Sequence, residues 1–292
     1  KYGDFVGGTK DKLLFILDNF KNYIQEQLGL NILMITQDIN KSGAKSFWLI
    51  STQNLQHLVL KQKHNLHMYE VILDQPCKLF FDIEYSTLLG KDAVYDFIKE
   101  VERIFFDSFS EILKLPLITT NFDENKNQII KKGLNGDEYS YHLVYFTEKR
   151  FKNNRIYLNH WINTVLLKQL PEKFTTGFVD NSVYSKTRSF RLLHQSKLGK
   201  EDQTSGIVNM KRLKELSKTT ESINDYNNIF HKPIEMLLIQ ELTETTFNDK
   251  NNNLFECYEI DCLDEDDTDK MFNGDINILS SLLTLPEKKQ EI

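Results

Sequence analysis

Residues 77–85 read CKLFFDIEY, an apolar run with aromatic and β-branched residues that carries two acids near its end. This composition predicts a buried β-strand. Side chains alternate between the faces of a strand, so Asp82 and Glu84 should point to the same side. Two neighbouring carboxylates repel each other unless they share a cation, and oxygen ligands favour Mg²⁺ or Mn²⁺. The run therefore predicts a metal site, and a solvated acidic strand end is the alternative.

The pattern of apolar residues places further strands and helices on both sides of this run, which predicts an α/β or α+β class. Predicted strands cover 31–36, 46–51, 67–73, 117–121, 139–146 and 188–194. Predicted helices cover 11–28, 52–61, 91–113 and 153–170, with weaker signals at 210–217, 231–242 and 277–285. The polar stretch 123–137, which holds two glycines, is predicted to be a loop.

Composition is that of an ordinary globular chain, with 292 residues, 40% hydrophobic and 27% charged. No apolar run is long enough to span a bilayer, so no membrane partner is expected. Three cysteines form no disulfide framework, which favours a reducing, intracellular compartment. The net charge is −6, yet residues 149–200 hold eleven Lys and Arg against two acids. This basic segment predicts phosphate contacts, with a solvated mixed surface as the alternative.

Two other segments carry polar residues in strand-like surroundings. Ser140 and His142 lie two apart in EYSYHLVYF (138–146) and so share a face. Residues 179–200 read VDNSVYSKTRSFRLLHQSKLGK, an acid, Asp180, followed by a basic strand-like stretch. An Asp-x-Glu, a Ser-x-His and a lone Asp in this order resemble the archaeo-eukaryotic primase superfamily. Within it, 179–200 and YEVILDQPCKLFFDIEY (69–85) resemble the eukaryotic PrimPol branch, which is related to herpesvirus-type primases.

The resemblance covers roughly residues 69–200 and implies a fold. We expect an RRM-like catalytic sheet packed against an N-terminal α/β module, which is the archaeo-eukaryotic primase fold, with the site in the cleft between them. The expected division is an N-terminal module at 1–66, a catalytic core at 67–255, and an acidic linker with a C-terminal helix at 256–292. Relatives often carry a C-terminal zinc-binding module. Cys257 and Cys262 have no Cys/His pair near them, so no zinc site is expected and we expect this chain to be the catalytic core alone.

The resemblance also implies roles for the acids and for the Ser-x-His pair. Asp82, Glu84 and Asp180 would hold two divalent cations, Mg²⁺ or Mn²⁺, for the in-line attack of a 3′-hydroxyl on an α-phosphate. Ser140 and His142 would donate hydrogen bonds to the triphosphate of the incoming nucleotide. Each has a plain alternative: Asp180 could cap a turn, and His142 could be a hydrogen-bonded interior histidine.

Basic and aromatic residues complete the implied site. Arg188, Arg191 and Lys197 would contact the triphosphate and the template or primer. Arg188 and Arg191 are three apart, so a regular strand puts them on opposite faces, and we expect at least one at a strand end or bulge. Tyr69 would lie near the nucleotide sugar and exclude a 2′-hydroxyl, with a half-buried strand tyrosine as the alternative.

Together these residues predict a template-dependent nucleotidyltransferase, a primase, a DNA polymerase or both, active in DNA replication or damage tolerance. Expected partners are a single-stranded DNA template and primer, dNTP or NTP, and a single-strand-binding protein or helicase. The expected location is intracellular, and in a eukaryote it would be the nucleus, the mitochondrion or both. One alternative is a metal-dependent nuclease, although the lysine it prefers two residues after Glu84 is absent. Another is a non-catalytic nucleic-acid-binding module, which would favour exposed aromatics on its central strands; Phe80 and Phe81 straddle both faces and leave this open.

Overall fold

The computed structural model describes most of the chain up to residue 199 and short pieces beyond it. The described residues are 5–28, 31–61, 65–113, 116–120, 131–133, 136–145, 147, 149–199, 206–207, 238–240, 257–258 and 260. All helices and strands below belong to one compact unit, Lys1–Tyr258, and Glu259–Ile292 forms a second unit. The predicted boundaries at 66 and 255 stay a prediction.

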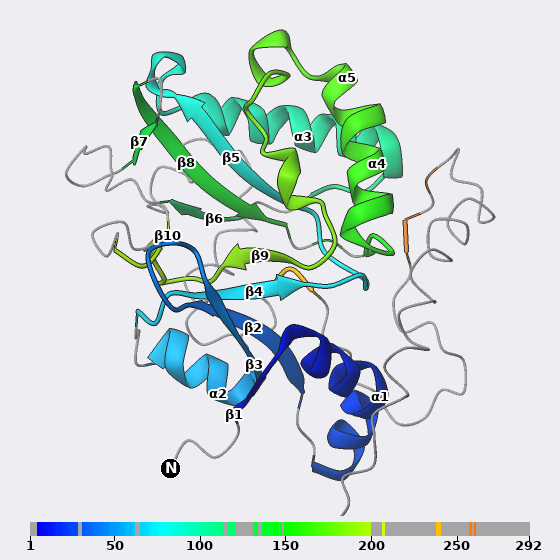
Figure 1. Cartoon of the computed structure of the whole chain (residues 1–292). Helices are drawn as coiled ribbons and strands as arrows, with labels where there is room; N and C mark the ends of the chain where they lie inside the picture. The colour runs from blue at the N-terminus through cyan, green and yellow to red at the C-terminus, as the bar shows by residue number, and fades with distance from the viewer. Residues whose placement is uncertain are drawn as a thin grey trace, which may run out of the picture. The chain divides into compact units, whose positions relative to one another are not determined.

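The first sheet has five antiparallel strands in the order β1-β3-β2-β4-β9 (Figure 1). Its strands are β1 (Phe5–Gly8), β2 (Ile32–Asp38), β3 (Lys45–Ser51), β4 (Met68–Ile72) and β9 (Arg188–Arg191). The helix α1 (Lys10–Leu28) presents Leu13 and Leu17 to Met34, Leu49 and Val71 of this sheet. Burial of each such side chain contributes roughly 1.5–3 kcal/mol to folding. A short helix, α2 (Thr52–Gln56), continues as a π-helical turn η1 (His57–Lys61) after β3.

The second sheet has the strand order β10-β6-β8-β5, with β7 also paired to β8, and every pairing is antiparallel. Its strands are β5 (Phe80–Ser86), β6 (Leu117–Thr120), β7 (Lys131–Gly133), β8 (Gly136–Val144) and β10 (Gly206–Ile207). The chain enters this sheet after β4 and returns to the first sheet at β9, so the two sheets exchange strands along the sequence.

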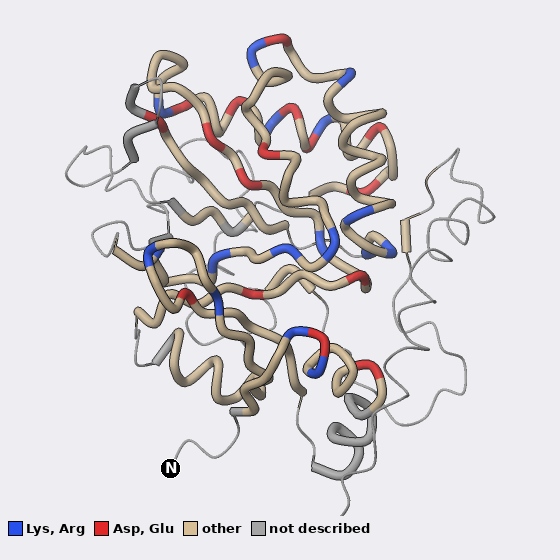
Figure 2. Tube along the Cα trace, viewed as in Figure 1, with Lys and Arg blue, Asp and Glu red and all other residues tan. Residues whose placement is uncertain are grey.

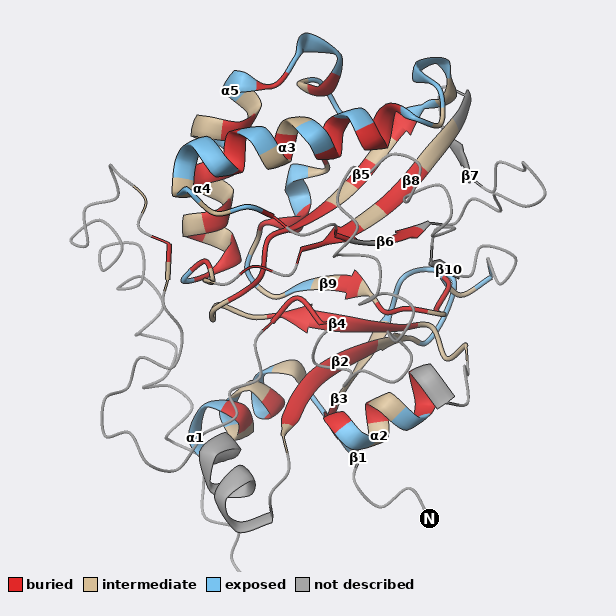
Figure 3. Ribbon diagram, turned by 180° about the vertical axis from the view of Figure 1, so that it is seen from behind, coloured by how far each residue is buried: buried red, intermediate tan, exposed pale blue. Residues whose placement is uncertain are grey.

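One face of the second sheet is covered by helices. The helix α3 (Ala93–Phe109) buries an apolar stripe, and its Phe97 ring lies 5.3 Å from that of Phe81 on β5. The irregular helical stretch from 154 to 169 adds Trp161, 5.6 Å from Phe105 of α3. Its parts are η3 (Asn154–Leu158), α4 (Asn159–Trp161), η4 (Ile162–Leu166) and α5 (Leu167–Gln169). Figure 3 shows the buried stripe of α3 beside β5 and β8.

Alternation along β5 then decides what faces away from these helices. Phe81, Ile83 and Tyr85 are buried with α3, so Phe80, Asp82 and Glu84 lie on the opposite face. Phe190 of β9 meets that face: its ring is 5.4 Å from the ring of Phe80. The second sheet thus has a helix-covered face and a face that contacts the first sheet through β9.

Most predicted elements are confirmed, and the class is a mixed α+β fold with antiparallel sheets. The loop prediction for 123–137 is wrong where β7 and the start of β8 occur. The predicted helix at 231–242 is wrong at 238–240, because Gln240 forms a β-bridge with Cys77. The strand predicted to end at 194 ends at Arg191. The weaker helices predicted at 210–217 and 277–285 lie outside the described residues, and so do residues 123–130 and 134–135 of the predicted loop.

Two short strands, β1 and β10, were not predicted. The sequence of β1 is FVGG, and two adjacent glycines weaken the sequence signal of a strand. Within the described part of the chain, no helix has both the length and the apolar character that a bilayer crossing needs.

Candidate active site

The Asp-x-Glu and Ser-x-His motifs meet across two hydrogen-bonded strands. β5 and β8 pair so that His142 lies opposite Asp82 and Ser140 lies opposite Glu84. Residues directly opposite each other in an antiparallel pair project to the same face. All four side chains therefore share the face of the second sheet that turns away from α3. Two motifs that are far apart in the sequence form one polar patch.

Asp180 reaches the same patch from the free edge of β5. Its main-chain N–H donates to the carbonyl oxygen of Asp82 at 2.9 Å, and Glu84 N–H donates to the carbonyl oxygen of Phe178 at 3.1 Å. Between these bonds Ile83 and Val179 form an antiparallel bridge. The segment 178–180 therefore extends the sheet by a short, strand-like piece, and Asp180 lies opposite Asp82.

Asp180 also fulfils the turn role that was its alternative. Its Oδ1 accepts a hydrogen bond from Ser182 N–H at 2.9 Å and so caps the short 3₁₀ helix η6 (Asn181–Val183). The cap uses Oδ1, and the side chain is only partly buried. Capping and ion binding are thus compatible at this position.

Several contacts set the electrostatics of the patch. His142 Nε2 is 3.6 Å from Asp82 Oδ1, and the His142 ring lies 4.4 Å from that of Phe190. Tyr184 donates its hydroxyl to the carbonyl oxygen of Phe80 at 2.8 Å. The pKa of Tyr184 is raised well above its ordinary value, first by burial and then by the negative charges of Asp82 and Asp180. The acids therefore impose a negative field on this face.

The carboxylates of this patch are chemically suited to bind a hard divalent cation. Asp82, Glu84 and Asp180 are partly buried carboxylates on one face, and carboxylate oxygens suit Mg²⁺ and Mn²⁺. Within the described ranges, however, no three His, Cys, Asp or Glu side chains converge into a metal-binding group. The backbone brings the acids together, and the side chains are not closed around a common point.

The basic residues of β9 are its first and last members. The register with β4 is regular, with Arg188 opposite Ile72 and Arg191 opposite Tyr69, so both arginines lie at strand ends without a bulge, as expected. Arg188 Nη2 donates to Ser182 Oγ at 2.7 Å, two residues from Asp180. Lys197 is exposed in the loop after β9. Figure 2 shows basic positions along β9 and acidic positions along β5.

Tyr69 lies in a second polar group, on the first sheet. Only 6% of it is exposed, and its hydroxyl donates to Asp38 Oδ2 at 2.7 Å. Lys45 Nζ lies 3.7 Å from the centre of the Tyr69 ring. The pKa of the Tyr69 phenol is raised, mainly by burial and also by its bond to Asp38, while Arg191 acts in the opposite direction. Asp38 and Lys45 belong to no sequence motif, so neither was predicted as a site residue.

Charged residues near the acidic patch also influence the polar group around Tyr69. The pKa of Lys45 is lowered, first by burial; Asp38 raises it, and the charges of Lys197 and Arg188 lower it further. Arg188 therefore lies close enough to influence Lys45 while it is bonded to the turn that carries Asp180. Arg188 thus contacts the turn that carries Asp180 and also contributes its charge to the environment of Lys45.

The aromatic residues of β5 do not form a stacking platform for bases. Phe80 and Phe81 have no exposed surface, and Tyr141 on β8 is 1% exposed. A single-stranded nucleic-acid platform requires exposed rings on which bases stack. This observation counts against the non-catalytic binding module.

Comparison with known proteins finds a distant similarity in sequence. No family model matches the chain. The chain is similar to a primase-polymerase: it is 25% identical over 228 residues to the DNA-directed primase/polymerase protein of Danio rerio. The match covers 62% of this chain and 41% of that protein, so the chain corresponds to less than half of its relative. The similarity supports a distant relationship to primase-polymerases.

Proposed function

We propose that this chain is the catalytic core of a template-dependent nucleotidyltransferase, a primase, a DNA polymerase or both, with the archaeo-eukaryotic primase fold. One observation carries the proposal: the β5–β8 register and the 178–180 segment bring Asp82, Glu84, Asp180, Ser140 and His142 to one face. The similarity to a DNA-directed primase/polymerase supports it independently.

In this proposal Asp82, Glu84 and Asp180 hold two divalent cations, Mg²⁺ or Mn²⁺. Such ions, when bound, stabilise the negative charge that develops during phosphoryl transfer. Ser140 and His142 lie beside the acids on β8, where a hydroxyl and an imidazole N–H can donate to phosphate oxygens. His142 Nε2 lies 3.6 Å from Asp82 Oδ1, so the imidazole adjoins the acids directly. Arg188, Arg191 and Lys197 supply positive charge for the triphosphate and the DNA backbone.

The proposed substrates are a single-stranded DNA template with a primer and dNTP or NTP. A single-strand-binding protein or a helicase is the proposed protein partner, and a role in replication or damage tolerance in the nucleus or mitochondrion follows the same resemblance. Tyr69 is the proposed sugar-contacting residue. Because its ring is covered by Lys45, a nucleotide would reach the ring at its edge or displace the Lys45 side chain.

The test is primer extension on a labelled primer annealed to a single-stranded template, with Mg²⁺ or Mn²⁺ and with EDTA as control. The proposal expects metal-dependent lengthening that stops where the nucleotide complementary to the template is withheld. Synthesis on an unprimed template measures primase activity separately. Shortened products would favour the nuclease, and DNA binding without new products would favour the non-catalytic module.

A further inference from the structure

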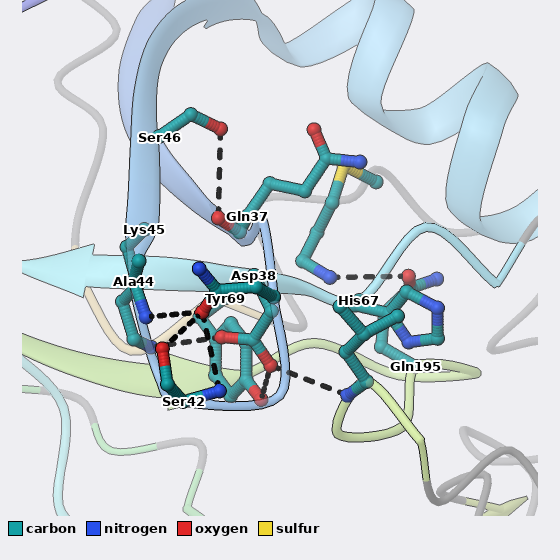
Figure 4. A network of polar contacts seen from close by, with 12 residues as sticks. Gln37, Asp38, Ser42, Ala44, Lys45, Ser46, His67, Tyr69 and Gln195 are labelled. Carbon is teal, nitrogen blue, oxygen red and sulfur yellow. Dashed lines mark hydrogen bonds and ion pairs between the residues drawn. The ribbon is translucent and has the colours of Figure 1, made fainter.

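Asp38, at the end of β2, connects three separate segments through one carboxylate. Oδ2 accepts the Tyr69 hydroxyl of β4 at 2.7 Å and the Leu198 main-chain N–H at 3.4 Å. Oδ1 is 3.7 Å from Lys45 Nζ of β3. Only 10% of the Asp38 side chain is exposed, so these contacts are partly shielded from water. Figure 4 shows the Asp38 carboxylate beside Tyr69 and Lys45.

The contact with Leu198 completes the attachment of the loop that carries Lys197. On the other side of Lys197, Gln195 Oε1 accepts Leu66 N–H at 2.7 Å, and Ser196 N–H donates to Asn65 Oδ1 at 3.0 Å. The backbone is therefore held immediately before and immediately after Lys197. The Lys197 side chain itself is exposed.

Asp38 is also an acid surrounded by basic residues. Lys45 contacts it directly, and Lys197 and Arg188 are close enough to influence Lys45. Arg191 lowers the pKa of Tyr69, whose hydroxyl donates a hydrogen bond to Asp38. If Asp38 affected a phosphate ligand through its charge alone, it would repel that ligand. If it acts through its hydrogen bonds, it would help binding by holding Tyr69 and Lys197 in place.

We propose that Asp38 is a positioning residue that fixes Tyr69 and the Lys197 loop relative to each other for the incoming nucleotide. The inference rests on the proposed function and adds a residue that the motifs do not contain. A fixed pair of contacts lowers the entropy cost of binding, because the groups are already ordered before the nucleotide arrives.

The charge and positioning roles predict changes of opposite sign, which makes the test direct. Asp38→Ala removes the charge and all three contacts, and should raise KM for dNTP in primer extension about tenfold with little change in kcat. Asp38→Asn removes the charge and keeps one acceptor oxygen, so its KM should lie between those of Asp38→Ala and the parent. A role through charge alone would instead lower KM in both variants.

The Kd of a fluorescent deoxynucleotide, measured without DNA, should also be highest for Asp38→Ala, intermediate for Asp38→Asn and lowest for the parent. Asp74→Ala is the matched control, since Asp74 is a partly buried acid paired with Arg155 at 3.2 Å, and its KM should equal that of the parent. Thermal unfolding checks folding, and if Asp38→Ala does not fold, Asp38→Asn still carries the sign of the effect.

An unchanged or lower KM in a folded Asp38 variant, with an active parent, would overturn the role of Asp38 and leave the proposed function intact. A parent that incorporates no nucleotide would overturn the proposed function itself, and the role of Asp38 with it.

Discussion

Asp180 and Asp82 are joined through the main chain, because the Asp180 N–H donates to the Asp82 carbonyl oxygen at 2.9 Å. Their relative position therefore depends on backbone pairing and not on either carboxylate. A substitution that removes one charge should leave this pairing in place. The acids can thus be tested one at a time without moving the others.

Asp180→Asn separates the observed capping role of Asp180 from its proposed metal-binding role. Asparagine caps a helix about as well as aspartate, so the bond to Ser182 and the thermal stability should be retained. The loss of a metal-ligating charge should lower nucleotide incorporation about a hundredfold or more. Thermal unfolding and primer extension measure the two effects separately. Near-parental activity in this variant would leave Asp180 with the capping role alone.

Arg191→Ala and Lys197→Ala should each weaken nucleotide or template binding. The loss of one phosphate contact should also reduce the salt dependence of DNA binding by about one charge. The measurement is the slope of log Kd against log salt concentration for a primed template. Lys168→Ala, an exposed lysine on α5, is the matched control. If both variants keep the parental slope and nucleotide affinity, these residues belong to the general surface.

Tyr69→Ala tests the sugar contact. If the ring excludes a 2′-hydroxyl, its removal should raise ribonucleotide use relative to deoxynucleotide use by about ten- to two-hundred-fold, or roughly 1–3 kcal/mol. The measured quantity is the ratio of kcat/KM for the two sugars in the variant and the parent. Because Tyr69 is 6% exposed, some loss of stability is also expected. A ratio that does not move would make Tyr69 an ordinary strand tyrosine.

The burial of Glu70 should make the unfolding free energy of the protein depend on pH. It is 3% exposed and accepts the main-chain N–H groups of Ile239 and Gln240, both at 2.9 Å, with Lys78 nearby. Burial raises the pKa of Glu70 from 4.5 to about 7, although both hydrogen bonds and Lys78 oppose the shift. Since the folded-state pKa is the higher one, the associated stability is fully present below pH 4.5 and is lost as the pH rises to about 7.

The shifted pKa of Glu70 changes the free energy of unfolding by on the order of 3 kcal/mol over this pH range. Chemical denaturation at pH 5 and pH 8 should therefore show a larger loss of unfolding free energy in the parent than in Glu70→Gln, which does not titrate. Burial also raises the pKa of Glu102 to about 7, but Glu102 is present in both proteins and cancels. An equal loss in parent and variant would place the Glu70 pKa near its ordinary value.

The sequence predicted the elements that carry strong periodicity and the motifs that lie on them. β5, β8 and α3 followed from apolar alternation and helical spacing, and the alternation placed Asp82 with Glu84. Which residue of β8 faces Asp82 could not be predicted, because register depends on pairing between distant segments. Asp38 was missed for a related reason: an acid before a turn has no pattern, and its role arises only where β4 and the loop after β9 approach it.

The proposed function requires that the acids of β5 bind the cations that nucleotide incorporation uses. The most direct measurement is Mn²⁺ binding, followed by electron paramagnetic resonance, together with primer extension for Asp82→Asn and Glu84→Gln. Asp107→Asn, an exposed acid on α3, is the control. Both β5 variants should fold like the parent, bind Mn²⁺ more weakly and lose incorporation about a hundredfold or more. The Asp107→Asn control should fold, bind Mn²⁺ and incorporate nucleotides like the parent. Parental incorporation by a folded Asp82→Asn or Glu84→Gln protein would contradict it.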